Sequence, residues 1–110
     1  MTFEEYEKQA LTTAIYNGNK MLDLCHWALG LSGESGEIAE KLKKIIRDQG
    51  ADPSKIDRED IKKELGDILW YITALAHELE IDLEDVAQTN VEKLTSRLQR
   101  GVVAGSGDNR

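Results

Sequence analysis

Helical periodicity runs along almost the whole of this 110-residue chain and is broken by a single proline, Pro53. Apolar residues recur every three to four positions on both sides of it, and no segment alternates convincingly between apolar and polar residues as a strand does. The weakly patterned stretch 49–54 around the proline predicts the main interhelical loop. The sequence therefore predicts an all-α fold, an antiparallel four-helix-type bundle.

Capping residues and turn signals mark the ends of four predicted helices. Thr2 and Glu5 form a capping-box pattern, and Asp57 and Asp82 are good N-caps for two later helices. The predicted bounds are Thr2 to about 17–19, about Leu22 to Arg47, Asp57 to Leu79, and Asp82 to Gly101. The residues expected to face the core are Tyr6, Ala10 and Ala14; Leu24, Trp27, Leu31, Ile38, Leu42 and Ile45; Ile61, Leu65, Ile68, Ile72, Leu75 and Leu79; and Val86, Val91, Leu94 and Leu98.

Chain length and charge restrict the class of protein. A chain of 110 residues forms one domain, 1–110, in which 102–110 reads as an extended tail rather than a fifth helix. Fourteen basic against 21 acidic residues give a net charge of −7, which argues against a nucleic-acid or anionic-membrane surface. One cysteine, Cys25, excludes an intrachain disulfide and is expected in the core. No secretory signal is apparent, and the most apolar stretch, 68–76, is too short to span a membrane, so a cytoplasmic location is expected.

Two acidic pairs stand at i, i+3 spacing: Glu34 with Glu37, and Glu64 with Asp67. Residues three apart share a helix face, so each pair can direct both carboxylates at one point. Glu34 and Glu64 fall within the inward stripes of successive helices, which places these acids at the edge of the apolar face. We therefore expect both pairs to converge on one site, on the same side of the second and third predicted helices.

Such a cluster needs a cation, because partly buried carboxylates repel one another and lose hydration. An all-oxygen set without His or Cys suits a hard ion, Mg²⁺ or Mn²⁺. The structural alternative is that acidic i, i+3 pairs simply lie on solvated helix faces. A di-iron bundle is a weak competitor, because it needs Glu-x-x-His pairs and the only comparable spacing here is Asp23-x-x-His26.

Four glycines lie inside predicted helices, where each costs roughly 1 kcal/mol relative to alanine. Gly30, Gly33 and Gly36 are spaced by three residues, and Gly66 stands between Glu64 and Asp67. Close helix packing is one explanation. The other is that the glycines leave room beside the carboxylates for a metal and the phosphates of a ligand.

The ordered set of motifs resembles the MazG-like nucleoside triphosphate pyrophosphohydrolases. That family carries Glu-x-x-Glu followed by Glu-x-x-Asp, which match segments 33–40 and 64–71 at a comparable spacing. The flanking segments 24–31 and 90–97 are also similar to the family's, so the resemblance covers the chain from about Leu24 onward. It implies an all-α fold assembled as a homodimer or homotetramer, and Mg²⁺-dependent cleavage of nucleoside triphosphates into a monophosphate and pyrophosphate.

The resemblance also implies roles for individual residues. Its metal-binding acids correspond to Glu34, Glu37, Glu64 and Asp67. Lys93 and Arg97 match basic groups directed at the phosphates, and Asn90 matches a polar position near metal or nucleotide.

Residue chemistry supports part of this assignment. Lys93 and Arg97 stand four apart on one helix face, where both can meet a triphosphate, although basic residues also favour the C-terminal end of a helix. Glu37 or Glu40 is the candidate general base, and Glu40 can alternatively face solvent. His26 and Trp27 are candidates for contacting the nucleobase, although Trp27 also fits the core stripe.

Two further expectations concern the partners of the chain. Helices two and three carry more apolar surface than one thin bundle covers, which predicts a homo-oligomer, at least a dimer. A non-catalytic helical module for nucleotide or protein binding is the alternative function. The acids within the core stripe and the four helix glycines favour the enzyme, because a simple interaction module needs neither.

Overall fold

The chain is helical and contains no strand. A computed structural model describes residues 1–110, and their elements in order are α1 (Phe3–Ala10), η1 (Leu11–Thr13), α2 (Lys20–Asp48), η2 (Pro53–Lys55), α3 (Arg58–Glu78) and α4 (Leu83–Gln99). The all-α prediction is therefore confirmed. None of these helices combines the length and the apolar character required to span a bilayer.

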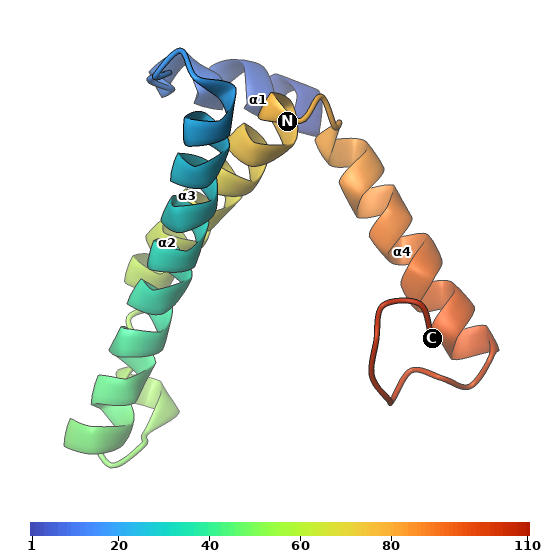
Figure 1. The fold of residues 1–110 in the computed structure, drawn as a ribbon. Helices are drawn as coiled ribbons and strands as arrows, with labels where there is room; N and C mark the ends of the chain where they lie inside the picture. The colour runs from blue at the N-terminus through green and yellow to red at the C-terminus, as the bar shows by residue number, and fades with distance from the viewer.

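The long helices α2 and α3 pack side by side along one arm of the molecule (Figure 1). Their connection bends at Gly50 and Ala51, both in the left-handed region at φ 64° and 56°. Asp57 caps α3 as predicted, since its side chain accepts a hydrogen bond from the Asp60 backbone at 3.1 Å. The loop around Pro53 is also confirmed, with a single 3₁₀ turn within it.

Helix α1 starts as predicted but ends earlier. Thr2 and Glu5 form both hydrogen bonds of the capping box, at 3.0 and 3.1 Å. The predicted extension to residue 17 is wrong, because the helix stops at Ala10 and continues only as the 3₁₀ turn η1. The hydroxyl of Thr12 donates to the carbonyl of Gln9 and that of Thr13 to the carbonyl of Ala10, and such local bonds compete with helical ones.

Helix α4 diverges from the other long helices, so the prediction of an antiparallel four-helix bundle is wrong for the single chain. It packs mainly against α1, and the ribbon forms an arch with α2 and α3 on one side and α4 on the other (Figure 1). The turn between α3 and α4 is set by Glu80 at φ 58° and by a 2.8 Å bond from the Ile81 backbone to the Ala76 carbonyl. Asp82 precedes α4 as predicted, but its side chain makes no capping bond.

This divergence leaves several expected core residues exposed. The inward placement predicted for α4 is wrong for all four of its residues, Val86, Val91, Leu94 and Leu98. Leu42, Leu65 and Leu79 are likewise exposed rather than buried, because no other element of the chain covers those faces.

The core lies where α1 crosses the start of α2 and the end of α3 (Figure 1). Trp27 is 2% exposed, and its ring meets those of Trp70 and Tyr71 at centroid distances of 5.4 and 6.5 Å. Trp70 also ties α1 to α3, because its indole nitrogen donates to the Ala10 carbonyl at 2.9 Å. Only seven of the 110 residues are buried.

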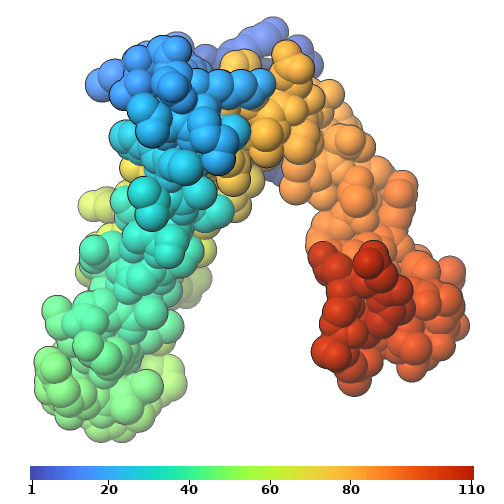
Figure 2. All heavy atoms as spheres, in the orientation of Figure 1, coloured from blue at the N-terminus to red at the C-terminus, as the bar shows by residue number.

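The overall shape is open. The radius of gyration is 17.1 Å, against about 13 Å for a compact domain of this length. Figure 2 shows the two arms separated by an unfilled space. Residues 102–110 form no fifth helix, as predicted, but they curl back along the end of α4 instead of extending away from it (Figure 1).

Candidate functional site

Three carboxylates from two helices meet beside the core. Glu34 of α2 and Glu64 and Asp67 of α3 each offer an oxygen, and these oxygens all lie within 4.8 Å of one another. Glu34 and Glu64 are half-buried and Asp67 is exposed. The predicted convergence on one side of the two helices is therefore confirmed for these three residues, which we call the carboxylate trio.

The trio carries more negative charge than its surroundings neutralise. The pKa of Glu34 is raised, first because its carboxyl shares a hydrogen bond with Glu64, then through partial burial and the charge of Asp67. The raised pKa means that these neighbours disfavour the ionised form of Glu34, and a bound cation would favour that form again.

Lys41 is the basic side chain that forms an ion pair with the trio, and it was not among the predicted site residues. Its ammonium contacts Glu64 at 3.6 Å and also forms an ion pair with Asp60. These acids raise the pKa of Lys41, the hydrogen bond with Asp60 contributing most. A signal existed in the sequence, because Lys41 stands seven residues after Glu34, two helical turns along the same face.

The remaining acids of the first motif lie outside the trio. Glu37 is exposed one turn beyond Glu34, and its charge contributes to the raised pKa of Glu34. Glu40 is engaged by Lys43 at 2.8 Å and Lys44 at 3.9 Å. Its pKa is lowered, mainly by the hydrogen bond with Lys43, so Glu40 is a weaker base than an unpaired glutamate.

The trio opens into a shallow hollow of about 350 Å³. Glu34 and Asp67 line it together with Thr13, Trp70 and Tyr71. Thr13 carries no sequence signal for this site, because it belongs to η1, which comes near α3 only in the folded chain. Aromatic walls beside two acids provide a recess in which a small ligand can reach the trio from solvent.

Tyr6 of α1 also lies close to this hollow. Its pKa is raised by partial burial and by the charge of Asp67, and a hydrogen bond with Thr73 opposes that shift. The phenol is therefore a neutral donor in the neighbourhood of the trio at physiological pH.

The helix glycines fall into two groups. A Cβ at Gly30 would lie 2.2 Å from the Tyr71 ring, so close helix packing explains this glycine. At Gly33, Gly36 and Gly66 a Cβ would meet nothing within 4 Å, and packing within the chain does not explain them.

The candidate nucleobase contacts differ in accessibility. Trp27 is buried in the aromatic cluster, where it has no free face for a base. His26 is exposed, and its ring stands 4.9 Å from that of Trp27. Cys25, expected in the core, is exposed instead.

No His joins the trio, in agreement with the weak case for a di-iron centre. Asp23 is buried and accepts a 2.8 Å hydrogen bond from the Asn17 backbone. His77 pairs with Glu7 of α1 at 2.7 Å. Both residues are therefore used elsewhere in the fold.

The predicted phosphate-binding residues Asn90, Lys93 and Arg97 all lie on α4, in the other arm of the arch (Figure 1). The single chain does not bring them to the carboxylate trio. Instead Lys93 contacts the Asp108 carboxylate at 3.0 Å and Arg97 contacts it at 3.3 Å. Lys93 and then Arg97 lower the pKa of Asp108.

Arg97 is held in an unusual position for a helix-surface arginine. It is 6% exposed beneath the tail, and its terminal nitrogen also donates to the Asp108 carbonyl at 2.8 Å. Its buried Nε has no hydrogen-bond partner. The tail therefore places a carboxylate on the two cations that were predicted to bind phosphate.

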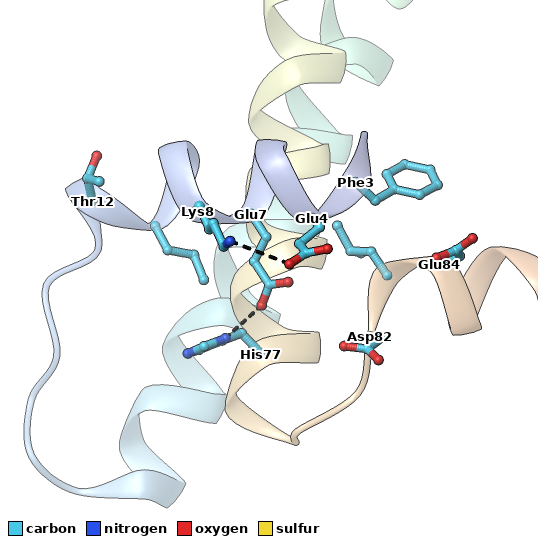
Figure 3. Close-up of a pocket in the computed structure, with 10 residues that line it drawn as sticks. Phe3, Glu4, Glu7, Lys8, Thr12, His77, Asp82 and Glu84 are labelled. Carbon is cyan, nitrogen blue, oxygen red and sulfur yellow. Dashed lines mark hydrogen bonds and ion pairs between the residues drawn. The ribbon is translucent and has the colours of Figure 1, made fainter. Parts of the chain in front are cut away.

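The largest hollow of the chain is elsewhere and has the wrong charge for phosphates. It measures about 670 Å³ and lies between α1, the end of α3 and the start of α4 (Figure 3). Glu4 and Glu7 line it from one side and Asp82 and Glu84 from the other, with Lys8 bound to Glu4 at 3.4 Å. A polyanion is repelled there.

The carboxylate trio fits a divalent cation on its own chemistry. Its donors are oxygen atoms only, which hard cations prefer, and they are clustered closely enough for one ion to contact several. The raised pKa of Glu34 reports the excess negative charge that an ion would neutralise.

Comparison with known proteins agrees with this geometry. The model of the MazG nucleotide pyrophosphohydrolase domain matches residues 26–102, a segment that contains the trio and the basic residues of α4. The chain is also similar to the "Gene 37 protein" of Mycobacterium phage L5, with 46% identity over 114 residues that span the whole of both proteins. No solved structure matches. The chain belongs to the MazG nucleotide pyrophosphohydrolase domain family.

Proposed function

We propose that this protein hydrolyses a nucleoside or deoxynucleoside triphosphate at the α–β phosphoanhydride, giving a nucleoside monophosphate and pyrophosphate. The observation that carries the proposal is the carboxylate trio, three oxygens within 4.8 Å of one another inside a MazG domain. Clearance of nucleotides from the cellular pool is the expected role.

Glu34, Glu64 and Asp67 would hold the metal, and Mg²⁺ is the ion we expect, with Mn²⁺ as a substitute. When bound, such an ion neutralises phosphate charge and makes water a stronger nucleophile. The protein's own part is to position the polyanion and to stabilise the charge that develops as the anhydride bond breaks.

The reaction also needs a group that takes a proton from water. Glu37 is suited to this role because it lies one turn from Glu34 and makes no ion pair in the fold, whereas Glu40 is bound to Lys43. A water oxygen forms the new bond to phosphorus, its proton passes to the Glu37 carboxylate, and the bridging oxygen leaves with the departing phosphate group.

His26 and the walls of the hollow are the groups that we assign to the nucleoside. The exposed His26 ring lies against Trp27, which fixes it as a surface for a base. Tyr71, fitted into the space left by Gly30, lines the hollow together with Trp70.

The test is a panel of ribo- and deoxyribonucleoside triphosphates, canonical and damaged, with pyrophosphate and orthophosphate measured separately. We expect pyrophosphate and monophosphate in equal amounts, and no turnover in EDTA until Mg²⁺ is restored. Orthophosphate as the product would indicate a γ-phosphatase. Absence of turnover for every member of the panel would favour the non-catalytic binding module.

A further inference from the structure

The tail, residues 102–110, folds back on the end of α4 as a loop that Arg110 holds closed (Figure 2). The Arg110 guanidinium donates hydrogen bonds of 2.7–3.2 Å to three backbone carbonyls of the loop, those of Gly107, Val103 and Val102. Arg100, the residue after α4, donates to the Arg110 carbonyl at 2.7 Å. The tail contains no helix or strand, so its shape depends on these few side-chain bonds.

Two glycines turn the tail toward α4. Gly101, two residues after the end of the helix, lies at φ 69°, and Gly107, directly before Asp108, lies at φ 86°. Both values fall in the left-handed region, which residues with a Cβ rarely adopt. The sequence therefore has a suitable residue at each reversal, and the second reversal directly precedes the one acidic residue of the tail.

The Asp108 carboxylate makes an incomplete contact with two cations of α4. The same oxygen, Oδ1, contacts Lys93 at 3.0 Å and Arg97 at 3.3 Å, while the side chain stays 81% exposed. Arginine binds a carboxylate most strongly through two parallel hydrogen bonds, and one oxygen shared between two cations does not give that arrangement. Because an exposed ion pair contributes little to stability, another anion can replace this one.

Arg97 has an unused hydrogen-bond donor beneath the tail. The residue is 6% exposed, and its Nη2 donates to the Asp108 carbonyl at 2.8 Å. Its buried Nε has no partner, which is costly for a charged donor. A phosphate group offers several oxygens and can accept from Nε and Nη2 together, in the bidentate geometry that arginine and phosphate favour. The unpaired Nε therefore points to an anion other than Asp108.

The tail and the end of α4 form a positive region in an acidic protein. Four basic side chains are bonded to the tail there: Lys93, Arg97, Arg100 and Arg110. Asp108 is the one acidic side chain that forms an ion pair with any of them. The chain as a whole carries a net charge of −7. A polyanion is therefore attracted to this end of α4 although the protein as a whole repels it.

We propose that the tail is a strap that competes with phosphate for Lys93 and Arg97. In the closed form the Asp108 carboxylate contacts both cations. In the open form a polyphosphate group takes its place and also binds the Arg97 Nε, and residues 105–110 leave α4. The strap rests on the proposed function, because a nucleoside triphosphate is the polyphosphate that would open it in the enzyme.

Such a strap lowers affinity in a defined way. For a ligand that binds only the open form, the apparent dissociation constant is the intrinsic one divided by the fraction of molecules that are open. Loss of the Asp108 charge, or of the bonds made by Arg110, increases that fraction and should tighten the binding of a polyphosphate. A tail that closes over the ligand, or whose arginine binds it, predicts the opposite, because both arrangements need an intact tail.

Inorganic tripolyphosphate in EDTA is the probe, because it needs neither turnover nor a metal at the carboxylate trio. Isothermal titration calorimetry at physiological ionic strength should show severalfold tighter binding by Asp108→Asn than by the wild type. Asp48→Asn is the matched control, since it removes an acidic charge from an exposed ion pair outside the tail, and it should bind as the wild type does. Equal affinities of Asp108→Asn and the wild type, or no binding by either, would overturn the strap.

Arg110→Gln is a second variant, for which charge and strap predict opposite results. The substitution removes a positive charge, which by itself weakens the binding of an anion. It also removes the three bonds that close the loop, so we expect binding severalfold tighter than in the wild type. Arg47→Gln removes an equal charge outside the tail and should not tighten binding. Weaker binding by Arg110→Gln would show that the tail helps to hold the anion, against the proposal.

Hydrogen exchange shows how the tail responds to the ligand. Tripolyphosphate should speed amide exchange in residues 105–110 of the wild type. Slower exchange there would mean that the tail closes over the ligand, and the strap would be wrong. Binding and exchange are both independent of activity. If no triphosphate is hydrolysed, the proposed function fails, and these two measurements still decide the strap.

Discussion

At the scale of single residues, the site brings like charges together, and their repulsion lowers the stability of the metal-free protein. Glu34, Glu64 and Asp67 approach within 4.8 Å with only Lys41 as a nearby counter-charge. The raised pKa of Glu34 shows that its ionised form is disfavoured there. A binding site that is strained when empty is stabilised by its ligand, so removal of one charge should have opposite effects with and without metal.

Glu34→Gln should therefore stabilise the metal-free protein. In EDTA at pH 7 we expect the free energy of unfolding to rise by about 1 kcal/mol, the Coulomb energy of like charges at this separation near solvent. Mg²⁺ should then no longer raise the melting temperature. Glu40→Gln is the matched control and should lower the free energy of unfolding. Lys43 lowers the pKa of Glu40, so the fold favours its charged form. Chemical unfolding in EDTA and in Mg²⁺ measures both, and a Glu34→Gln protein that Mg²⁺ stabilises normally would exclude Glu34 as a ligand.

Asp108 pairs with Lys93 and Arg97, the two cations that we propose for the phosphates of the substrate. Asp108→Asn should speed amide exchange in residues 105–110 and lower the KM for the triphosphate severalfold, because a competing carboxylate is removed. Asp48→Asn breaks an exposed ion pair with Arg47 and serves as the control. An unchanged KM together with unchanged exchange would show that the tail contact has no effect on the site.

The same contact has a defined dependence on pH. The folded pKa of Asp108 lies below its usual value of 3.8, so the contact stabilises the tail above about pH 4 and is lost as pH falls through the lowered pKa. A carbon NMR titration of the Asp108 carboxyl should give a midpoint below 3.8. A midpoint at or above that value would mean that Lys93 and Arg97 do not hold the tail in solution.

At the scale of helices, the direction of a glycine-to-alanine effect depends on whether another element is close. Gly30→Ala places a methyl group in the Tyr71 ring and should lower the free energy of unfolding by about 1–3 kcal/mol. Gly66→Ala meets open space and should raise it by up to ~1 kcal/mol through helix propensity. Denaturant unfolding of both variants at the same protein concentration measures the two free energies of unfolding. Equal effects of the two substitutions would contradict the packing described for Tyr71.

Local sequence signals predicted those features that depend on local interactions. The caps at Thr2 and Asp57, the loop at Pro53 and the Glu64–Asp67 pair all act within a few residues, and the structure agrees with them. The Glu34–Glu37 pair agrees only in part, because Glu37 lies outside the trio. The early end of α1 was missed because the hydroxyls of Thr12 and Thr13 turn to backbone carbonyls that helical periodicity does not describe.

Features that depend on the path of the chain could not be read from periodicity. Val86, Val91, Leu94 and Leu98 of α4 were predicted to face inward and are exposed. The amphipathic pattern of a helix does not reveal whether any element of the same chain covers its apolar face. Lys41 and Thr13 reach the site only through the pairing of α2 with α3 and the return of η1. The Asp108 contact similarly depends on the tail folding back.

At the scale of the whole molecule, the chain is an open arch with many exposed apolar side chains. A radius of gyration of 17.1 Å and seven buried residues leave the single chain with a small core. Much of its stability should then come from association, and the melting temperature should rise with protein concentration. A hundredfold increase favours the folded dimer by about 2.7 kcal/mol. A melting temperature that stays constant across that concentration range in calorimetry would contradict the expected role of association.

The central claim is that the carboxylate trio carries out metal-dependent pyrophosphate release. The most direct measurement is the initial rate of pyrophosphate formation in Mg²⁺ by the wild type, by Asp67→Asn and by Asp48→Asn, which removes an equal charge far from the site. We predict a loss of about 100-fold or more for Asp67→Asn, because a metal ligand is removed, and a wild-type rate for Asp48→Asn. An undiminished rate in Asp67→Asn, or orthophosphate as the product of the wild type, would contradict the account.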